Sequence, residues 1–261
     1  MPGFAVLLLL AAVQGLAEFL PVSSSAHLVL AQYALGVSTP GPSLELYLHA
    51  GTLVSVCLFY RRRIAAVLAD MARGGASGWR YAACVVVSAV PAGAAYFLCG
   101  DKFEAVYDSP RAVGALMVLN GILLLVSSAI VRSPRGGDVS FSRALAMGLG
   151  QALAILPGVS RSGTSIGAGR IAGMGAAKAA EFSFLMSVPA IAGAIAAEAA
   201  RGGSEACSGG CGTWGLAAAA VVSAAVGYCA LALVVRTLER GRFWIFGAYC
   251  LAAGALVSVF A

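Results

Sequence analysis

The chain has 261 residues, of which 60% are hydrophobic and only 11% are charged, with 17 Lys and Arg against 11 Asp and Glu. A soluble domain carries about 25% charged residues, and so few charges cannot cover this much apolar surface in water. The shortage of charge also excludes a disordered chain and a nucleic-acid-binding protein. The composition predicts an all-α polytopic membrane protein, whose net charge of +6 reflects cytoplasmic loops.

The first apolar stretch, residues 2–35, is interrupted by the motif PVSSSAH from Pro21 to His27. Proline breaks a helix, and a cluster of hydroxyls cannot face lipid. The stretch therefore predicts a re-entrant hairpin, in which two half-length helices meet at a polar tip inside the protein. We expect no cleavable signal peptide, because no basic region precedes the apolar residues.

Six further stretches approach the length of about 20 apolar residues that a helix needs to cross a bilayer. They are Glu45–Tyr60, Tyr81–Cys99, Arg111–Val131, Glu181–Ala200, Trp214–Val235 and Phe243–Ala261. Residues 143–175 lie between the third and the fourth and are interrupted by PGVSRSG, from Pro157 to Gly163. This interruption predicts a second re-entrant hairpin. A disulfide between Cys207 and Cys211, in the loop before the fifth span, is left open.

The two halves of the chain, about 1–131 and 143–261, resemble each other. A shift of 136 residues superimposes three landmarks, namely Pro21 on Pro157, Ser24 on Ser160 and Glu45 on Glu181. Each half holds one hairpin and three spans, and because three is odd, the second half is expected to be inverted relative to the first. Inverted repeats place a binding site near the midplane, where broken helices meet. Glu45 and Glu181 are expected to cap helix N-termini.

Arginine is concentrated in residues 61–80, 132–143 and 236–242. Because Lys and Arg accumulate on the cytoplasmic side, we expect these three segments inside and both chain ends outside. The first hairpin would then enter the membrane from the outer face and the second from the cytoplasm.

The first hairpin carries residues suited to acid–base and nucleophilic chemistry. Gln14 and Glu18 share one helix face, and a carboxylate inside a membrane helix indicates function by default. Hydroxyls and an imidazole follow at the tip, from Ser23, Ser24, Ser25 and His27. The alternative is that Glu18 pairs with Arg161 only as a structural brace. His49, one turn after Glu45, is a weaker candidate for the site.

The second hairpin carries residues suited to phosphate. Arg161 presents a planar donor fork, and backbone N–H groups at a glycine-rich helix start favour an anion. The expected phosphate-binding set is Ser23 and Ser25 from the first tip with Ser160, Arg161, Ser162, Gly163, Thr164 and Ser165 from the second. Close helix packing is the alternative for the small residues. A divalent cation, Mg²⁺ or Ca²⁺, bound by Glu18 with help from Gln14, would bridge acid and phosphate.

At this point QGLAEFLPVSSSAH (Gln14–His27), PGVSRSG (Pro157–Gly163) and EFSFLMSVPA (Glu181–Ala190) resemble the bacterial undecaprenyl pyrophosphate phosphatases, also called bacitracin-resistance proteins. The resemblance covers essentially the whole chain. It implies divalent-cation-dependent hydrolysis of undecaprenyl pyrophosphate to undecaprenyl phosphate and phosphate. This reaction recycles the lipid carrier of peptidoglycan synthesis and confers bacitracin resistance. The resemblance also implies a site on the outer side of the bacterial plasma (inner) membrane.

The resemblance assigns catalytic roles to Glu18, Ser24, His27 and Arg161. Our hypothesis for these positions is that Ser24 attacks the terminal phosphorus or positions a water that does so, and that His27 protonates the leaving group or activates the nucleophile. Gln14 stands at a family position that is Glu or Gln, so the motif here has one carboxylate instead of two. Ser25-Ala26 replaces the Thr-Gly of many members.

Two rival functions remain at this level. A flippase of undecaprenyl phosphate, alone or coupled to hydrolysis, fits the broken helices equally well. A carrier of small anions is a weaker alternative. The expected partners are the polyprenyl pyrophosphate substrate and membrane lipids, and a homodimer is left open.

Overall fold

A computed structural model describes residues 3–37, 42–104, 106, 109–131, 136–200 and 212–260. Apart from one isolated β-bridge between Gly137 and Met174, these residues form only helices and turns, which confirms the all-α prediction. The helices are α1 (Phe4–Phe19), α2 (Ser24–Ala34), α3 (Pro42–Phe59), α4 (Arg61–Ala72), α5 (Ala76–Glu104), α6 (Pro110–Ile130), α7 (Phe141–Ala152), α8 (Arg161–Ile171), α9 (Ala176–Ala200), α10 (Gly212–Glu239) and α11 (Trp244–Phe260). A single 3-10 turn, Leu153–Ile155, follows α7.

Both predicted hairpins are present. The chain leaves α1 at Phe19 in an extended conformation and re-enters a helix at Ser24, so the break falls on the PVSS motif. Ser23 caps α2 with a positive φ of 72°, a region that L-residues other than glycine rarely adopt. Backbone strain of this kind is characteristic of functional sites and costs on the order of 1–3 kcal/mol.

The second hairpin consists of α7, the 3-10 turn and α8. Gly158 takes a φ of +99°, which only glycine adopts without strain, and this lets the chain turn before the N-cap residue Ser160. The side chain of Ser160 accepts the N–H of Gly163 at 3.2 Å, as an N-cap should. The tip of the hairpin is therefore a helix N-terminus.

The six predicted spans each coincide with a helix, namely α3, α5, α6, α9, α10 and α11. Three segments of the described chain are long and apolar enough to cross a membrane, namely Ala76–Leu98 in α5, Pro110–Ile130 in α6 and Gly212–Glu239 in α10. The apolar parts of α3 and α11 are shorter. The total of six crossings and the inverted orientation of the halves stay predictions.

The Arg-rich segment 61–80 is helical rather than an open loop. It forms α4 and the start of α5, which pack together as a helical hairpin. Asp70 holds the turn, because its carboxylate accepts hydrogen bonds from the hydroxyl of Ser77 at 2.7 Å and the N–H of Gly78 at 2.5 Å. These donors keep the pKa of Asp70 below its usual range.

The expected capping role of Glu181 is wrong. The helix α9 begins five residues earlier, at Ala176, and the carboxylate of Glu181 instead forms an ion pair with Arg63 at 3.0 Å. The matching prediction for the side chain of Glu45 lies outside the described residues, as does the disulfide between Cys207 and Cys211.

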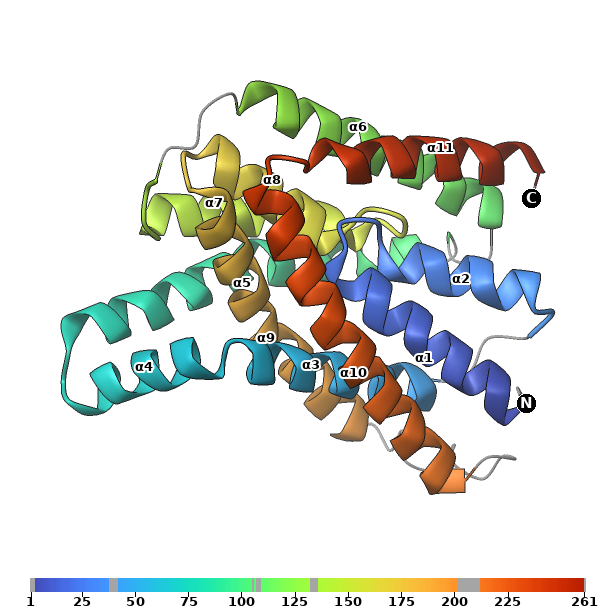
Figure 1. Ribbon diagram of the computed structural model, residues 1–261, viewed down its shortest axis with the longest axis horizontal. Coiled ribbons are helices and arrows are strands. Elements are labelled where there is room, and N and C mark those ends of the chain that lie inside the picture. The colour runs from blue at the N-terminus through green and yellow to red at the C-terminus, as the bar shows by residue number, and fades with distance from the viewer. Residues whose placement is uncertain are drawn as a thin grey trace.

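The two hairpins pack into a frame of longer helices. Figure 1 shows α10 crossing the centre of the molecule, where it contacts α1 and α3, while α6 and α11 lie side by side. The helices approach closely through small residues: a Cβ added to Gly15 would lie 2.5 Å from the carbonyl oxygen of Ser223, and one added to Gly121 would lie 2.8 Å from that of Gly247. Such contacts are typical of helix packing in membranes.

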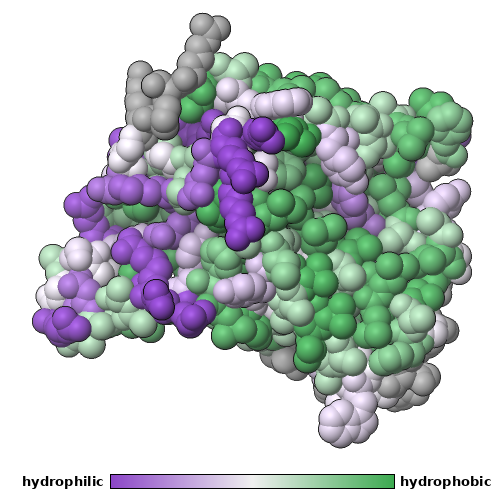
Figure 2. All heavy atoms as spheres, viewed as in Figure 1, coloured by the Kyte–Doolittle hydropathy of each residue, from purple (hydrophilic) through white to green (hydrophobic). Residues whose placement is uncertain are grey.

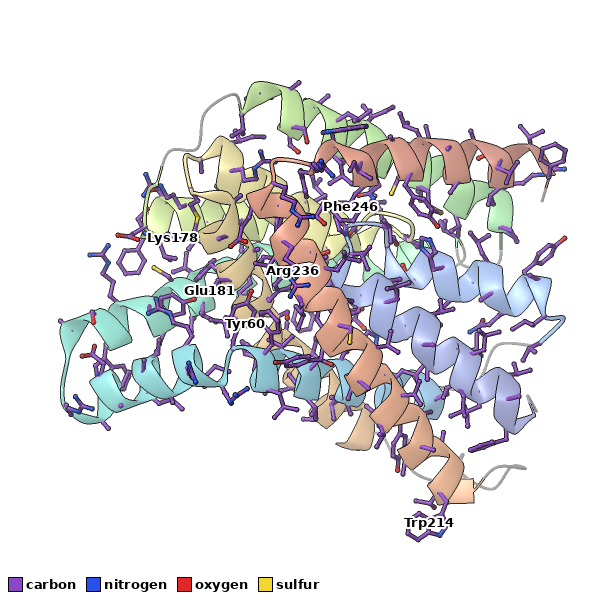
Figure 3. All side chains as sticks on the ribbon, in the orientation of Figure 1. Tyr60, Lys178, Glu181, Trp214, Arg236 and Phe246 are labelled. Carbon is purple, nitrogen blue, oxygen red and sulfur yellow. The ribbon has the colours of Figure 1, made fainter. Side chains whose placement is uncertain are left out.

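The exposed surface is largely apolar. Figure 2 shows hydrophilic side chains gathered toward the end of the molecule that holds the α4–α5 turn, and hydrophobic side chains over most of the remaining face. Figure 3 places Lys178 and Glu181 toward this hydrophilic end and Trp214 at the lower edge of the view, at the start of α10. Large apolar residues such as Phe97 and Val221 are exposed on α5 and α10, as expected for helices that contact lipid.

Candidate active site

The carboxylate of Glu18 lies where the two hairpin tips meet, and both of its oxygens are engaged. Oε1 accepts the guanidinium of Arg161 at 2.5 Å, and Oε2 accepts the hydroxyl of Ser24 at 2.7 Å. The amide of Gln14 also donates to Oε2 at 3.1 Å. Only 8% of Glu18 is exposed. The buried carboxylate thus accepts a hydrogen bond from a hydroxyl of its own hairpin and pairs with the arginine guanidinium of the other hairpin.

Two buried polar atoms of this cluster have no hydrogen-bond partner among the described residues. They are the Nη1 of Arg161, which is a donor, and the Oε1 of Gln14, which is an acceptor. An unsatisfied buried polar atom is costly, so each calls for a ligand or water. The donor suits a phosphate oxygen, and the acceptor suits a cation.

The remaining residues of the first tip lie around Ser24. The hydroxyls of Ser23 and Ser25 lie 3.1 Å apart. The Nδ1 of His27 lies 2.7 Å from the carbonyl of Ser23, so it must carry the proton, and Nε2 lies 2.8 Å from the hydroxyl of Tyr249 on α11. The ring of His27 also stacks on that of Tyr249. His27 is thus held beside the tip.

The hydroxyls of the second tip are engaged mostly with the protein itself. Ser162 bonds to Ser160 and to the carbonyl of Leu20 in the first hairpin, at 3.1 and 3.4 Å. Thr164 donates to the backbone of its own helix, and Ser165 donates to the carbonyl of Arg161 at 2.6 Å. These two hydroxyls reach the carbonyl of Arg161, but no described contact joins them to a side chain of the Glu18 cluster. Their phosphate-binding role stays a prediction.

The two tips have the same local structure, and equivalent residues are 137 positions apart instead of the expected 136. The N-caps Ser23 and Ser160 are 137 residues apart, and the Ser160–Ser162 hydroxyl pair repeats the Ser23–Ser25 pair at the same 3.1 Å. A shift of 137 also places Gln14 on Gln151. Ser24 and Arg161 therefore hold equivalent positions, the first residue of α2 and of α8, and bind opposite oxygens of one carboxylate.

Asn120, in the middle of α6, joins the two tips. Its side-chain oxygen accepts the N–H of Ser160 at 3.0 Å, and its amide donates to the carbonyl of Pro21 at 3.2 Å and contacts Cys250 at 3.3 Å. Asn120 is fully buried. One side chain therefore fixes the distance between the two hairpin breaks.

The divalent cation that the resemblance implies can be compared with these residues. Among the described residues, no group of three or more His, Cys, Asp or Glu could hold a metal ion. Mg²⁺ does not require such a group, because it binds through one or two carboxylates together with substrate phosphates. Glu18 and the unpartnered oxygen of Gln14, among the described residues, fit that mode.

Most of the predicted residues are brought together, and a few were missed. Glu18, Ser24 and Arg161 form one cluster, and Gln14 joins it and also contacts His49 at 3.3 Å. Sequence reasoning did not select Asn120, although a lone amide inside an apolar span is the signal that could have found it. It also overlooked Tyr249, which carries no such signal at the end of an aromatic-rich apolar helix.

The fold and the site together define an integral membrane protein with a buried acid–serine–arginine centre built from two helical hairpins. The chain belongs to the family of the bacitracin resistance protein BacA, whose model matches residues 7–256. It is 39% identical to the undecaprenyl-diphosphatase of Rubrobacter xylanophilus, with 96% of this chain and 95% of the relative aligned. It is 37% identical to the undecaprenyl-diphosphatases of Desulfosudis oleivorans (94% and 93% aligned) and Desulforudis audaxviator (95% and 94%).

Proposed function

We propose that this protein hydrolyses undecaprenyl pyrophosphate to undecaprenyl phosphate and inorganic phosphate, as the names of its relatives state for them. The observation that carries the proposal is the carboxylate of Glu18, which receives Ser24 from one hairpin and Arg161 from the other. Phosphoryl transfer needs little more than positioning and charge neutralisation, and this cluster supplies both. The activity makes the protein a phosphatase of the lipid carrier, and its expected consequence is resistance to bacitracin.

The proposed reaction begins with Ser24. Its hydroxyl donates to Glu18 Oε2 at 2.7 Å, so Glu18 can take the proton as Oγ bonds to the terminal phosphorus. The bond between that phosphorus and the bridging oxygen breaks, and undecaprenyl phosphate leaves. Water then hydrolyses the phosphoserine. In the variant with one step, the same hydroxyl positions a water and Glu18 takes the proton of that water.

Arg161 and His27 have supporting roles in this proposal. The free Nη1 of Arg161 binds a phosphate oxygen, and its charge stabilises the transition state. To act as the acid, His27 must carry a second proton on Nε2, because its Nδ1 proton is donated to Ser23; the imidazolium then gives the Nε2 proton to the leaving oxygen in place of its contact with Tyr249. Ser160, Ser162, Gly163, Thr164 and Ser165 complete the anion-binding helix N-terminus of the second tip.

We further propose Mg²⁺ or Ca²⁺ as the cofactor, with Glu18 and Gln14 as its protein ligands. When bound, the cation neutralises charge on the pyrophosphate oxygens. The substrate head would sit at the meeting point of the tips while the polyprenyl tail lies among membrane lipids. The proposed location is the bacterial plasma membrane with the site open to the outer side, and the Arg-rich segments support that orientation.

The test uses the full-length protein in detergent with undecaprenyl pyrophosphate and Mg²⁺. We expect one phosphate released per undecaprenyl phosphate formed, and a loss of at least 100-fold in turnover for Arg161→Ala, the order expected when a transition-state donor is removed. Glu181→Gln is the matched control, because it also breaks an arginine–carboxylate pair but lies away from the tips. Hydrolysis by Arg161→Ala at the wild-type rate would overturn the assignment.

A further inference from the structure

A cavity lies at the other end of α8 from the hairpin tip. It has a volume of about 870 Å³ and opens between the ends of α6, α8, α10 and α11. Apolar side chains form much of its wall, including Leu125, Met174, Leu238 and Trp244, while Arg170 supplies a positive charge. The cavity is therefore amphipathic, with a cation beside an apolar surface.

Arg170 has no polar partner in the part of the chain that the structure describes. Its guanidinium lies over the ring of the buried Phe243, 5.1 Å from the centroid, and its Nη1 is buried without a hydrogen bond. The other cation of the cavity, Lys178, is already paired with Asp138. An arginine held against an aromatic ring in this way keeps its donors available for an anion.

This cavity is separate from the proposed active site. Arg161 and Arg170 are nine residues apart on the same helix, which corresponds to a rise of about 14 Å at 1.5 Å per residue. No described contact joins Arg170 to Glu18, Ser24 or Asn120. A ligand on Arg170 would thus leave the tips free.

We propose that this cavity binds the phosphate headgroup of a membrane phospholipid, with the phosphate on Arg170 and an acyl chain along the apolar wall. The guanidinium matches phosphate oxygens in charge and geometry. A free anion gains no stabilisation from contact with the apolar side chains of Leu125, Leu238 and Trp244, whereas a lipid buries its acyl chain against them.

Bound lipid is measured on the full-length protein in a nonionic detergent, by native mass spectrometry and thermal unfolding. The probes are phosphatidylglycerol, diacylglycerol with the same acyl chains, and inorganic phosphate. We expect phosphatidylglycerol alone to bind and to raise the unfolding temperature. Equal binding of diacylglycerol would show an apolar groove without headgroup recognition, and equal stabilisation by phosphate would show a free-anion site. Either result overturns the proposal.

Variants of Arg170 locate the lipid. Arg170→Gln should lower the occupancy by phosphatidylglycerol about tenfold, while Arg170→Lys retains part of it because the charge remains. Arg240→Gln is the matched control, since Arg240 is an exposed arginine at the same end of the molecule that does not line the cavity. Hydrolysis by Arg170→Gln should stay within twofold of wild type, which also shows that the variant is folded. Unchanged lipid occupancy in folded Arg170→Gln would overturn the proposal.

Discussion

The guanidinium of Arg161 lies 2.5 Å from the carboxylate of Glu18, so the only ion pair at the described hairpin tips joins residues 143 positions apart. Such a pair serves either as a brace or as part of a catalytic site. Removing one member of a buried pair costs about 3–5 kcal/mol, whereas replacing both by neutral groups is often nearly neutral. Stability and turnover can therefore be separated.

We expect Glu18→Gln and Arg161→Met each to lower the unfolding temperature, and the double variant to regain most of it. Turnover should stay at least 100-fold below wild type in all three, because the double variant restores no charge to the site. Thermal unfolding and phosphate release, both in the same detergent, provide the two readouts. A double variant that hydrolyses at a near wild-type rate would show that the pair is a brace.

Asn120 allows a different test, because it contacts the backbone of both tips and not the Glu18 cluster. Asn120→Leu keeps the approximate volume but leaves Ser160 N–H and the Pro21 carbonyl unpaired, at about 1–3 kcal/mol for each. We expect kcat to fall by about 10- to 100-fold while KM changes little, because the tips separate but the binding groups remain.

The matched control for Asn120 is Ser127→Ala. Ser127 is buried on the same helix, and within the described part of the chain its hydroxyl bonds only to the carbonyl of Leu124 in α6. The kcat of Asn120→Asp should lie between those of Asn120→Leu and Ser127→Ala, since this variant keeps the acceptor for the N–H of Ser160 and loses the amide donors. If Asn120→Leu lowered the unfolding temperature without lowering kcat, Asn120 would have a structural role alone.

The sequence predicts the hairpins because a proline followed by hydroxyls cannot continue a lipid-facing helix. The meeting of Glu18 and Arg161 also follows, since buried charges at membrane depth must pair. The number of residues that separates equivalent positions of the two tips cannot be predicted from the sequence in this way. Aligning Pro21 with Pro157 gives 136, whereas the caps are set by Ser23 and Ser160, because a proline marks the turn and the cap marks the start of the helix.

Other features depend on tertiary contacts that no local pattern encodes. Asn120 binds backbone groups of two distant turns, so no pairing of side chains in the sequence points to it. Glu181 was expected at a helix start because the apolar run begins there, yet α9 extends back to Ala176 through residues with good helix propensity. The pair that Glu181 forms with Arg63 depends on how α4 packs against the rest of the protein.

Attack by Ser24 and attack by a positioned water predict opposite stereochemical outcomes at the terminal phosphorus. If Ser24 attacks, two in-line displacements retain the configuration of a chirally labelled phosphate, and acid quenching traps a phosphoserine at position 24. Ser24→Ala removes the attacking hydroxyl itself, so turnover should then fall on the order of 10⁶-fold, as when a nucleophilic serine is removed. Inversion of configuration, with no phosphoserine in the peptide that contains Ser23, Ser24 and Ser25, would instead assign the attack to water.

In the proposed cation site, Gln14 would set how strongly the protein binds a divalent cation before substrate arrives. Its Oε1 is buried and has no hydrogen-bond partner among the residues that the structure describes. Gln14→Glu would place two carboxylates four residues apart on one face of α1. We expect divalent-cation affinity to rise about tenfold, or about 1.4 kcal/mol, measured by isothermal titration of Mn²⁺ into substrate-free protein. The like charges should also lower the unfolding temperature in chelator, with recovery on adding Mg²⁺.

Gln151→Glu is the matched control for this cation test. Gln151 is the equivalent residue of α7 and is also buried with a free Oε1, but Ile155 stands where Glu18 would be, so the new carboxylate has no acidic partner. It should lower stability in chelator without a gain in Mn²⁺ affinity, because one buried carboxylate alone makes a weak site. Equal affinities for Gln14→Glu and the wild type would remove Gln14 from the proposed cation site and leave Glu18 as its only proposed protein ligand.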